Sequence, residues 1–299
     1  MHKVALAVVF SMIWHIASAD TDVPTKYTKR DGIANTRHNL SMSRIAGNVI
    51  MDQVRNDYGE ICVYCHTPHG TSKVLEAPLW NRTANGVVYT TYGQLNTATL
   101  QGTVTQPGVN SLTCLSCHDG TLAMDSIINM PGDGNYSVNQ VITEDNSFLN
   151  AWPSGKAIPT TRHYRLNALN DSSSCLSCHD RGSGPSGNGA TDFTVFAIGT
   201  DLRDDHPIGV RYPTTRLGTE FKIPTGFTES MSFFDTDGNR RADSYEIRMY
   251  DTGEGPEVEC ASCHDPHGVT PFNVPGKFNP SFLRVRNTGS KLCFTCHII

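Results

Sequence analysis

The chain has few charged and few apolar residues for its length. Of its 299 residues, 18% are charged and 38% are hydrophobic, whereas 26 glycines and 16 prolines favour turns. This composition argues against an ordinary core built from the side chains of a layered fold. The formal net charge is −5, and no basic stripe indicates a nucleic-acid-binding surface. Beyond residues 4–17, no apolar run is long enough to cross a bilayer.

The N-terminus has the pattern of a secretory signal peptide. Lys3 precedes the apolar residues 4–17, and Ala17-Ser18-Ala19 has the small-x-small form of a cleavage site. We expect residues 1–19 to be removed and residues 20–299 to form one secreted domain, either extracellular or at the cell surface. A periplasmic location and an uncleaved N-terminal anchor are the alternatives.

All ten cysteines belong to five Cys-x-x-Cys-His motifs. This spacing is typical of covalent haem c attachment, in which two thiols bond to the porphyrin vinyl groups and the histidine binds the iron. Structural disulfides would need no histidine after each pair. A zinc ribbon joins two pairs into one site, so five pairs would leave one over. The sequence therefore predicts five covalent haem c groups, at Cys62, Cys65 and His66; Cys114, Cys117 and His118; Cys175, Cys178 and His179; Cys260, Cys263 and His264; and Cys293, Cys296 and His297.

The predicted fold is mostly irregular coil with short α-helices and a few short strands, organised around a chain of haems. Each motif should form a short helical turn, because its histidine must project towards the iron. Outside the motifs, residues 41–57 have approximately helical spacing of apolar side chains, and residues 87–92 favour a short strand.

Five histidines lie outside both the motifs and the signal segment, namely His38, His69, His163, His206 and His267. Because their number equals that of the motifs, we expect two histidines on every iron. Methionine is the alternative second ligand, but we interpret Met42, Met51, Met124, Met130, Met231 and Met249 as packing residues. An iron closed on both faces favours electron transfer over catalysis. The chain also lacks the Cys-x-x-Cys-Lys motif that commonly marks the substrate haem of five-haem nitrite reductases.

Two segments repeat within the chain. "SLTCLSCHDGT" at 111–121 is similar to "SSSCLSCHDRG" at 172–182, and "CHTPHG" at 65–70 is similar to "CHDPHG" at 263–268. His69 and His267 each follow a motif histidine by three residues, an offset that reaches an adjacent haem more easily than the opposite face of its own. A solvated or propionate-bonded histidine is the alternative at each position.

Residues 235–246 match most of the calcium-binding loop of an EF-hand. Asp235, Asp237, Asn239, Arg241, Asp243 and Glu246 occupy loop positions 1, 3, 5, 7, 9 and 12, where position 7 offers its backbone carbonyl. Arg240 stands where such a loop usually has glycine, and no convincing helices flank the segment. Calcium binding and a solvated acidic turn therefore both remain open.

With these motifs, the sequence resembles the multihaem cytochromes of metal-reducing bacteria that carry doubled Cys-x-x-Cys-His motifs. Within that group it is most similar to the extracellular filament-forming cytochromes, called cytochrome nanowires. The resemblance is carried by "RHNLS" (37–41), "ICVYCHTPHG" (61–70), "APLWN" (77–81), "TCLSCHDGT" (113–121), "DHPIG" (205–209), "VECASCHDPHG" (258–268) and "FLRVRNTGSKLCFTCH" (282–297).

The resemblance implies a chain of bis-histidine haems with little regular secondary structure. It also implies a head-to-tail homopolymer in which His38 ligates a haem of the neighbouring subunit; ligation within its own chain is the alternative. The most similar relatives carry four haems. The extra motif at Cys175 and the spare His163 therefore indicate an inserted haem module over approximately residues 121–205.

These observations predict a secreted electron carrier rather than an enzyme. The leading interpretation is a conduit, polymerised or not, that exchanges electrons with partner cytochromes or extracellular acceptors. A soluble periplasmic shuttle and a multihaem reductase are the alternatives.

Overall fold

Short helices and short strands are separated by long irregular segments. The computed structural model describes residues 33, 36–40, 58, 60–75, 77–84, 86–129, 164–167, 174–180, 192–213, 220–269 and 279–298. The expected signal peptide, the helix expected over 41–57 and the candidate ligand His163 lie outside these residues, as do Met42, Met51 and Met130. The described part agrees with the predicted fold class of mostly coil with short elements.

The helices are all brief. The α-helices are α2 (Val109–His118), α3 (Cys260–Cys263) and α4 (Lys291–Cys296). The 3-10 helices are η2 (Cys62–Tyr64), η3 (Tyr92–Leu95), η5 (Cys175–Ser177), η6 (Thr194–Phe196), η7 (Pro280–Phe282) and η8 (Thr288–Ser290). Each of the five motifs lies on one of these helical turns, which confirms that expectation.

One backbone hydrogen bond recurs in the motifs. The amide of the motif histidine donates to the carbonyl of the first cysteine at His66, His179, His264 and His297, over 2.7–3.1 Å. In the remaining motif, His118 ends α2. Because residues i, i+3 and i+4 share one face of a helical turn, this bond puts both thiols and the imidazole on the same side. The spacing of the motif therefore produces its local structure directly.

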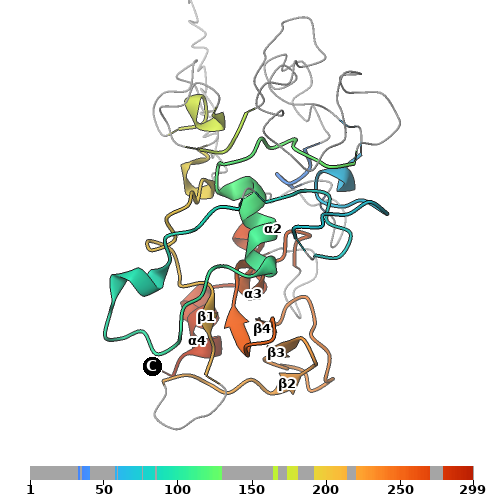
Figure 1. Cartoon of the computed structure of the whole chain (residues 1–299). Helices are drawn as coiled ribbons and strands as arrows, with labels where there is room; N and C mark the ends of the chain where they lie inside the picture. The colour runs from blue at the N-terminus through green and yellow to red at the C-terminus, as the bar shows by residue number, and fades with distance from the viewer. Residues whose placement is uncertain are drawn as a thin grey trace, which may run out of the picture.

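A five-stranded antiparallel sheet lies at one end of the molecule, near α4 (Figure 1). Its strands are β1 (Val210–Arg211), β2 (Gly226–Phe227), β3 (Met231–Phe233), β4 (Arg248–Asp251) and β5 (Pro256–Val258), in the order β1-β5-β4-β3-β2. Gly226 pairs with Phe233, and a Cβ at this glycine would lie 2.2 Å from the phenyl ring. The register here therefore requires glycine.

The strand predicted over residues 87–92 is wrong. This segment forms only an isolated bridge between Thr90 and Asp201, and η3 begins at Tyr92. The segment does not pair as a strand because its backbone bonds to a side chain. The amide and carbonyl of Tyr89 bond to the side-chain amide of Gln106 at 2.8 and 3.0 Å, where a neighbouring strand would otherwise bond.

Buried apolar side chains of the described residues form three small clusters rather than one continuous core. The cluster of Tyr212, Phe234, Ile247 and Met249 packs against β4 and touches Cys263 and Cys296. A second cluster touches Cys65. Apolar packing is therefore gathered next to the motif cysteines, and the fully buried Met249 is a packing residue, as predicted. Within the described part of the chain, no helix has the length and apolar character needed to span a bilayer.

Among the residues that the structure describes, Arg82 is the largest fully buried side chain, and it anchors the segment that ends α2 and follows it. Its guanidinium donates to the carbonyl oxygens of Ser116, Ala123, Met124 and Ser126, at 2.7–3.0 Å, and to the Ser116 hydroxyl at 3.2 Å. Four carbonyl groups of the segment 116–126 thus obtain their hydrogen bonds from one side chain, which fixes the turn that follows α2.

Replacing Arg82 with leucine should lower the free energy of unfolding by at least about 3 kcal/mol, because several buried carbonyl groups lose their donor. Arg203→Leu is the matched control. Arg203 bonds only to Asp201 in an ion pair whose side chains are 41% and 53% exposed, so its loss should cost at most about 1 kcal/mol. Guanidinium unfolding of the holoprotein, followed by circular dichroism, measures both. Equal losses in the two variants would contradict the anchoring role of Arg82.

Candidate haem-binding sites

None of the ten cysteines, all of which the structure describes, forms a disulfide. Burial raises the pKa of Cys65, Cys175 and Cys296 to about 12 and that of Cys263 to about 11. A thioether bond to a porphyrin vinyl group leaves the sulfur neutral, so these buried positions suit the neutral sulfur of covalently attached haem c.

The second and fourth motifs lie against each other through a buried carboxylate. Glu259 accepts a hydrogen bond from the Gly108 amide at 3.0 Å, at the N-terminus of α2, and another from the Ser111 hydroxyl. Ser111 in turn accepts from the Cys260 amide at 2.8 Å, at the start of α3. Two attachment sites are thus brought together from segments far apart in the sequence.

His66 and His267 face each other with nearly parallel rings. Their centroids are 6.3 Å apart and their planes differ by 13°. Metal–imidazole bonds are about 2 Å long, so two imidazoles on one metal ion have centroids roughly 6 Å apart. The two rings therefore have the spacing of axial ligands on one iron. His267 thus lies next to the motif histidine of another motif rather than its own.

His38 and His118 form a second pair of this kind. Their ring centroids are 6.2 Å apart, with the planes at 84°. Burial, followed by repulsion from His118, lowers the pKa of His38 to about 4. Burial likewise lowers the pKa of His118. Both rings are therefore held in the neutral form that binds iron.

His206 is the next candidate ligand. Burial lowers the pKa of His206, and the charge of His297 lowers it further. His69 is exposed after the first motif, as are His206 and His267. The ring of His179 stacks on Phe193 with centroids 3.9 Å apart and planes within 2°.

Several ligand candidates have their Nδ1 atom committed to an acceptor. Nδ1 of His118 lies 2.7 Å from the Phe196 carbonyl oxygen, and Nδ1 of His264 lies 2.8 Å from that of Ser281. A carbonyl oxygen only accepts, so Nδ1 carries the proton and Nε2 keeps its lone pair for a metal. These contacts orient the rings as carbonyl or carboxylate partners orient metal-binding histidines generally.

The third motif packs beside the segment that follows the second. Arg165 forms isolated bridges with Ala123 and with Ser174, which immediately precedes Cys175. Ser174 caps η5 by accepting from the Leu176 amide at 3.0 Å. The stretch interpreted as an inserted module is thus joined to the second motif through the described residues 164–167.

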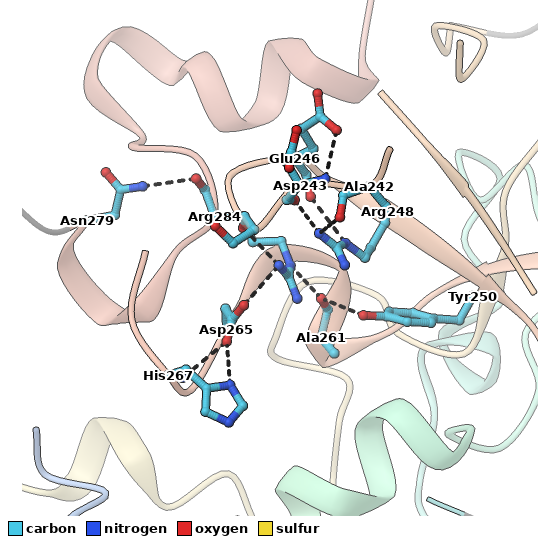
Figure 2. Close-up of polar contacts among 11 residues, drawn as sticks. Ala242, Asp243, Glu246, Arg248, Tyr250, Ala261, Asp265, His267, Asn279 and Arg284 are labelled. Carbon is cyan, nitrogen blue, oxygen red and sulfur yellow. Dashed lines mark hydrogen bonds and ion pairs between the residues drawn. The ribbon is translucent and has the colours of Figure 1, made fainter. Parts of the chain in front are cut away.

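Around the fourth motif, the structure adds residues that the sequence analysis had not singled out. Asp265 accepts a hydrogen bond from Nδ1 of His267 at 2.9 Å and pairs with the buried Arg284 at 3.2 Å (Figure 2). The hydrogen bond that His267 donates to Asp265 raises the pKa of His267, in contrast to the burial that lowers the pKa of His38, His66, His118, His206 and His264. A sequence signal did exist, because "CHDPHG" has aspartate where "CHTPHG" has Thr67.

The acidic loop 235–246 connects β3 to β4. Carboxylate oxygens of Asp235, Asp237 and Glu246 lie within 4.8 Å of one another. Asp235 accepts from the amides of Gly238 and Arg240, at 2.8 and 3.0 Å. Arg240 has a φ of 62°, the left-handed conformation for which an EF-hand loop uses glycine. The backbone thus makes the expected turn despite the substitution, and it does so between strands rather than helices.

The remaining predicted ligands of this loop take part in hydrogen bonds across it. The Asn239 amide donates to Asp237 at 2.9 Å and to Asp243 at 2.5 Å, and the Tyr245 hydroxyl donates to Asp237 at 2.7 Å. Arg241 donates its amide to the Asn239 side chain at 2.7 Å. The predicted positions therefore converge on one turn.

Comparison with known proteins agrees with the motif analysis. Residues 254–298 match the family described as the doubled CXXCH motif, and this segment contains the fourth and fifth motifs. No curated protein matches the chain. The family match supports a multihaem c-type cytochrome that carries covalently bound haem c and takes part in electron transfer.

Proposed function

We propose that this chain is a secreted pentahaem cytochrome that passes electrons from haem to haem and does not transform a substrate. The observation that carries the proposal is the spacing of the two histidine pairs. His66 with His267 and His38 with His118 have centroid separations of 6.3 and 6.2 Å, which suit two axial ligands on one iron.

In this function the bound haems supply one-electron storage, and the chain supplies their attachment, ligation and spacing. The cysteines hold each group by its edge. The paired imidazoles close both faces of an iron, so that substrates have no open position to enter. The hydrogen bonds of Glu259 and Ser111 bring the second and fourth attachment sites together, and close approach between haems is what electron transfer along a chain requires.

The finer proposal is assembly into an extracellular head-to-tail filament, as the resemblance to cytochrome nanowires implies. A heterologous contact that does not close into a ring grows into such a filament. The centroid of the His38 ring lies 6.2 Å from that of the His118 ring in the same chain. This contact supports the alternative of ligation within the chain. The exposed His69 is available for a contact between subunits.

The loop 235–246 is proposed as a calcium site that stabilises the β3–β4 connection. Carboxylate oxygens of Asp235, Asp237 and Glu246 lie within 4.8 Å of one another and offer the oxygen ligands that calcium prefers. The buried Glu246 stands at the position that provides the bidentate ligand in an EF-hand loop. Calcium would here have a structural role, separate from electron transfer.

The purified protein should carry five haems and bind little carbon monoxide when reduced. Mass spectrometry of the holoprotein should give the mature chain plus five haems, with no titratable thiol. Carbon monoxide needs an open iron position, which bis-histidine ligation removes. Stoichiometric carbon monoxide binding at one haem would instead support a reductase, and a lower haem count would contradict the pentahaem proposal.

His38→Ala should convert one of the five haems to the high-spin state without loss of covalent haem. The wild type, diluted until it is monomeric, should remain fully low-spin, because His38 lies against a histidine of its own chain. Electron paramagnetic resonance of the oxidised protein measures the spin states. A high-spin signal that appears in the wild type on dilution would instead indicate that a neighbouring subunit provides the ligand.

Chelation of calcium should lower the melting temperature of the wild type but not that of Asp235→Ala. The physical reason is that the ion is bound by the folded loop and not by the unfolded chain. Asp201→Ala, which removes an exposed aspartate elsewhere, is the control and should keep the sensitivity to chelation. Differential scanning calorimetry checks all three proteins. A wild-type melting curve indifferent to chelation would leave only an acidic turn.

A further inference from the structure

Among the ligand candidates, His267 has an unusual partner. Its Nδ1 atom lies 2.9 Å from Oδ1 of Asp265, and its backbone amide donates to the same oxygen at 3.1 Å. His118 and His264, by comparison, direct Nδ1 at backbone carbonyl oxygens. A carboxylate is a stronger acceptor than a carbonyl oxygen, because it carries a full negative charge.

Asp265 is itself held in place by Arg284. Nη1 of Arg284 lies 3.2 Å from Oδ2 of Asp265 and donates to the Ser244 carbonyl at 2.8 Å. Nε donates to the Ala261 carbonyl at 2.9 Å. The side chains of Arg284 and Asp265 are 6% and 16% exposed, so solvent screens their interaction little. Figure 2 shows Asp265 between the guanidinium and the imidazole, with His267 extending away from Arg284.

The geometry fixes the tautomer of His267. An ionised carboxylate only accepts, so Nδ1 carries the proton and Nε2 is free as a ligand atom. The partner ring is that of His66, in the first motif, at 6.3 Å. The network therefore runs from Arg284, which lies between the fourth and fifth motifs, through Asp265 to His267. It ends beside His66, the histidine of the first motif.

The similar segment "CHTPHG" at 65–70 lacks this arrangement. At the position equivalent to Asp265, Thr67 donates its hydroxyl to the backbone carbonyl of His69 at 2.9 Å. Threonine has no charge and its hydroxyl is directed at the backbone rather than the ring. One residue thus separates two otherwise similar segments, "CHTPHG" and "CHDPHG", and changes what the second histidine contacts.

We propose that Asp265, positioned by Arg284, makes His267 a stronger electron donor and so lowers the reduction potential of the haem attached at Cys62 and Cys65. This inference rests on the proposed function, because it requires His66 and His267 to share an iron. A hydrogen bond from a ligand imidazole to a carboxylate increases the basicity of the ligand. A more basic ligand stabilises the oxidised, more positively charged iron. Asp265 and Arg284 are positioning residues, since neither touches the iron.

The test is the reduction potential of each haem in Asp265→Asn. The neutral amide preserves the shape of the side chain but removes its charge. One haem of the five should become easier to reduce by about tenfold in its one-electron equilibrium constant, or about 59 mV. Spectroelectrochemistry measures the potentials, and electron paramagnetic resonance should show altered g values for one low-spin haem. Asp265→Glu, which restores the carboxylate, should return both readings towards those of the wild type.

Asp119→Asn is the matched control. Asp119 also follows a motif histidine directly, but its carboxylate accepts from the Tyr89 hydroxyl and the Thr121 amide, both at 2.8 Å. Loss of this charge should leave the g values unchanged and shift the potentials less. If Asp265→Asn behaves like Asp119→Asn while retaining five haems, the proposed role of Asp265 is wrong.

His267→Ala separates this failure from a failure of the ligand assignment. If His267→Ala produces one high-spin haem but Asp265→Asn has no specific effect, only the role of Asp265 is overturned. If His267→Ala leaves every haem low-spin, His267 is not a ligand, and both the inference and the ligand set on which it depends are wrong.

Discussion

The arrangement of the described chain depends on one buried carboxylate. Glu259 accepts hydrogen bonds from Gly108 and Ser111, and its own amide donates to the Ser262 hydroxyl at 2.9 Å. It directly follows β5, so the same residue joins the sheet to α3 and α3 to α2. Burial raises the pKa of Glu259 to about 7, and its hydrogen bonds oppose this effect. Because this buried carboxylate must keep its hydrogen bonds, it allows only one alignment of α2 with α3 and so of the two attachment motifs.

The junction of α2 and α3 also sets the positions of segments that lie far apart in the sequence. With α2 and α3 fixed together, the loop after α3 carries His267 towards the first motif, and the end of α2 presents His118 to His38. Arg82 then fixes the turn that follows α2. Each anchor is a polar side chain that satisfies several backbone groups, which is how irregular chain can be buried without long helices or sheets. Apolar side chains fill only the small clusters between these anchors.

The sequence predicts what is local and misses what depends on the path of the chain. The motif spacing is sufficient for a helical turn, because the thiols and the imidazole must share one face. The strand expected over 87–92 is wrong because Gln106, far outside the segment, satisfies Tyr89. The sheet was not located, since strands of two to four residues are too short for a period of two to be recognised. The identity of each histidine pair likewise depends on folds of the chain that no spacing encodes.

Five identical motifs do not imply five equivalent sites. With haem c at each motif, as proposed, differences in potential would arise from axial ligands, hydrogen bonds and burial. The motifs here differ in these respects. The ring of His179 stacks on an aromatic side chain, His118 bonds to a carbonyl, and His267 bonds to a carboxylate backed by a cation. A chain of equal potentials would conduct without preference for either direction. Variation in the residues just beyond a repeated motif therefore lets duplicated segments acquire different potentials while their attachment chemistry stays fixed.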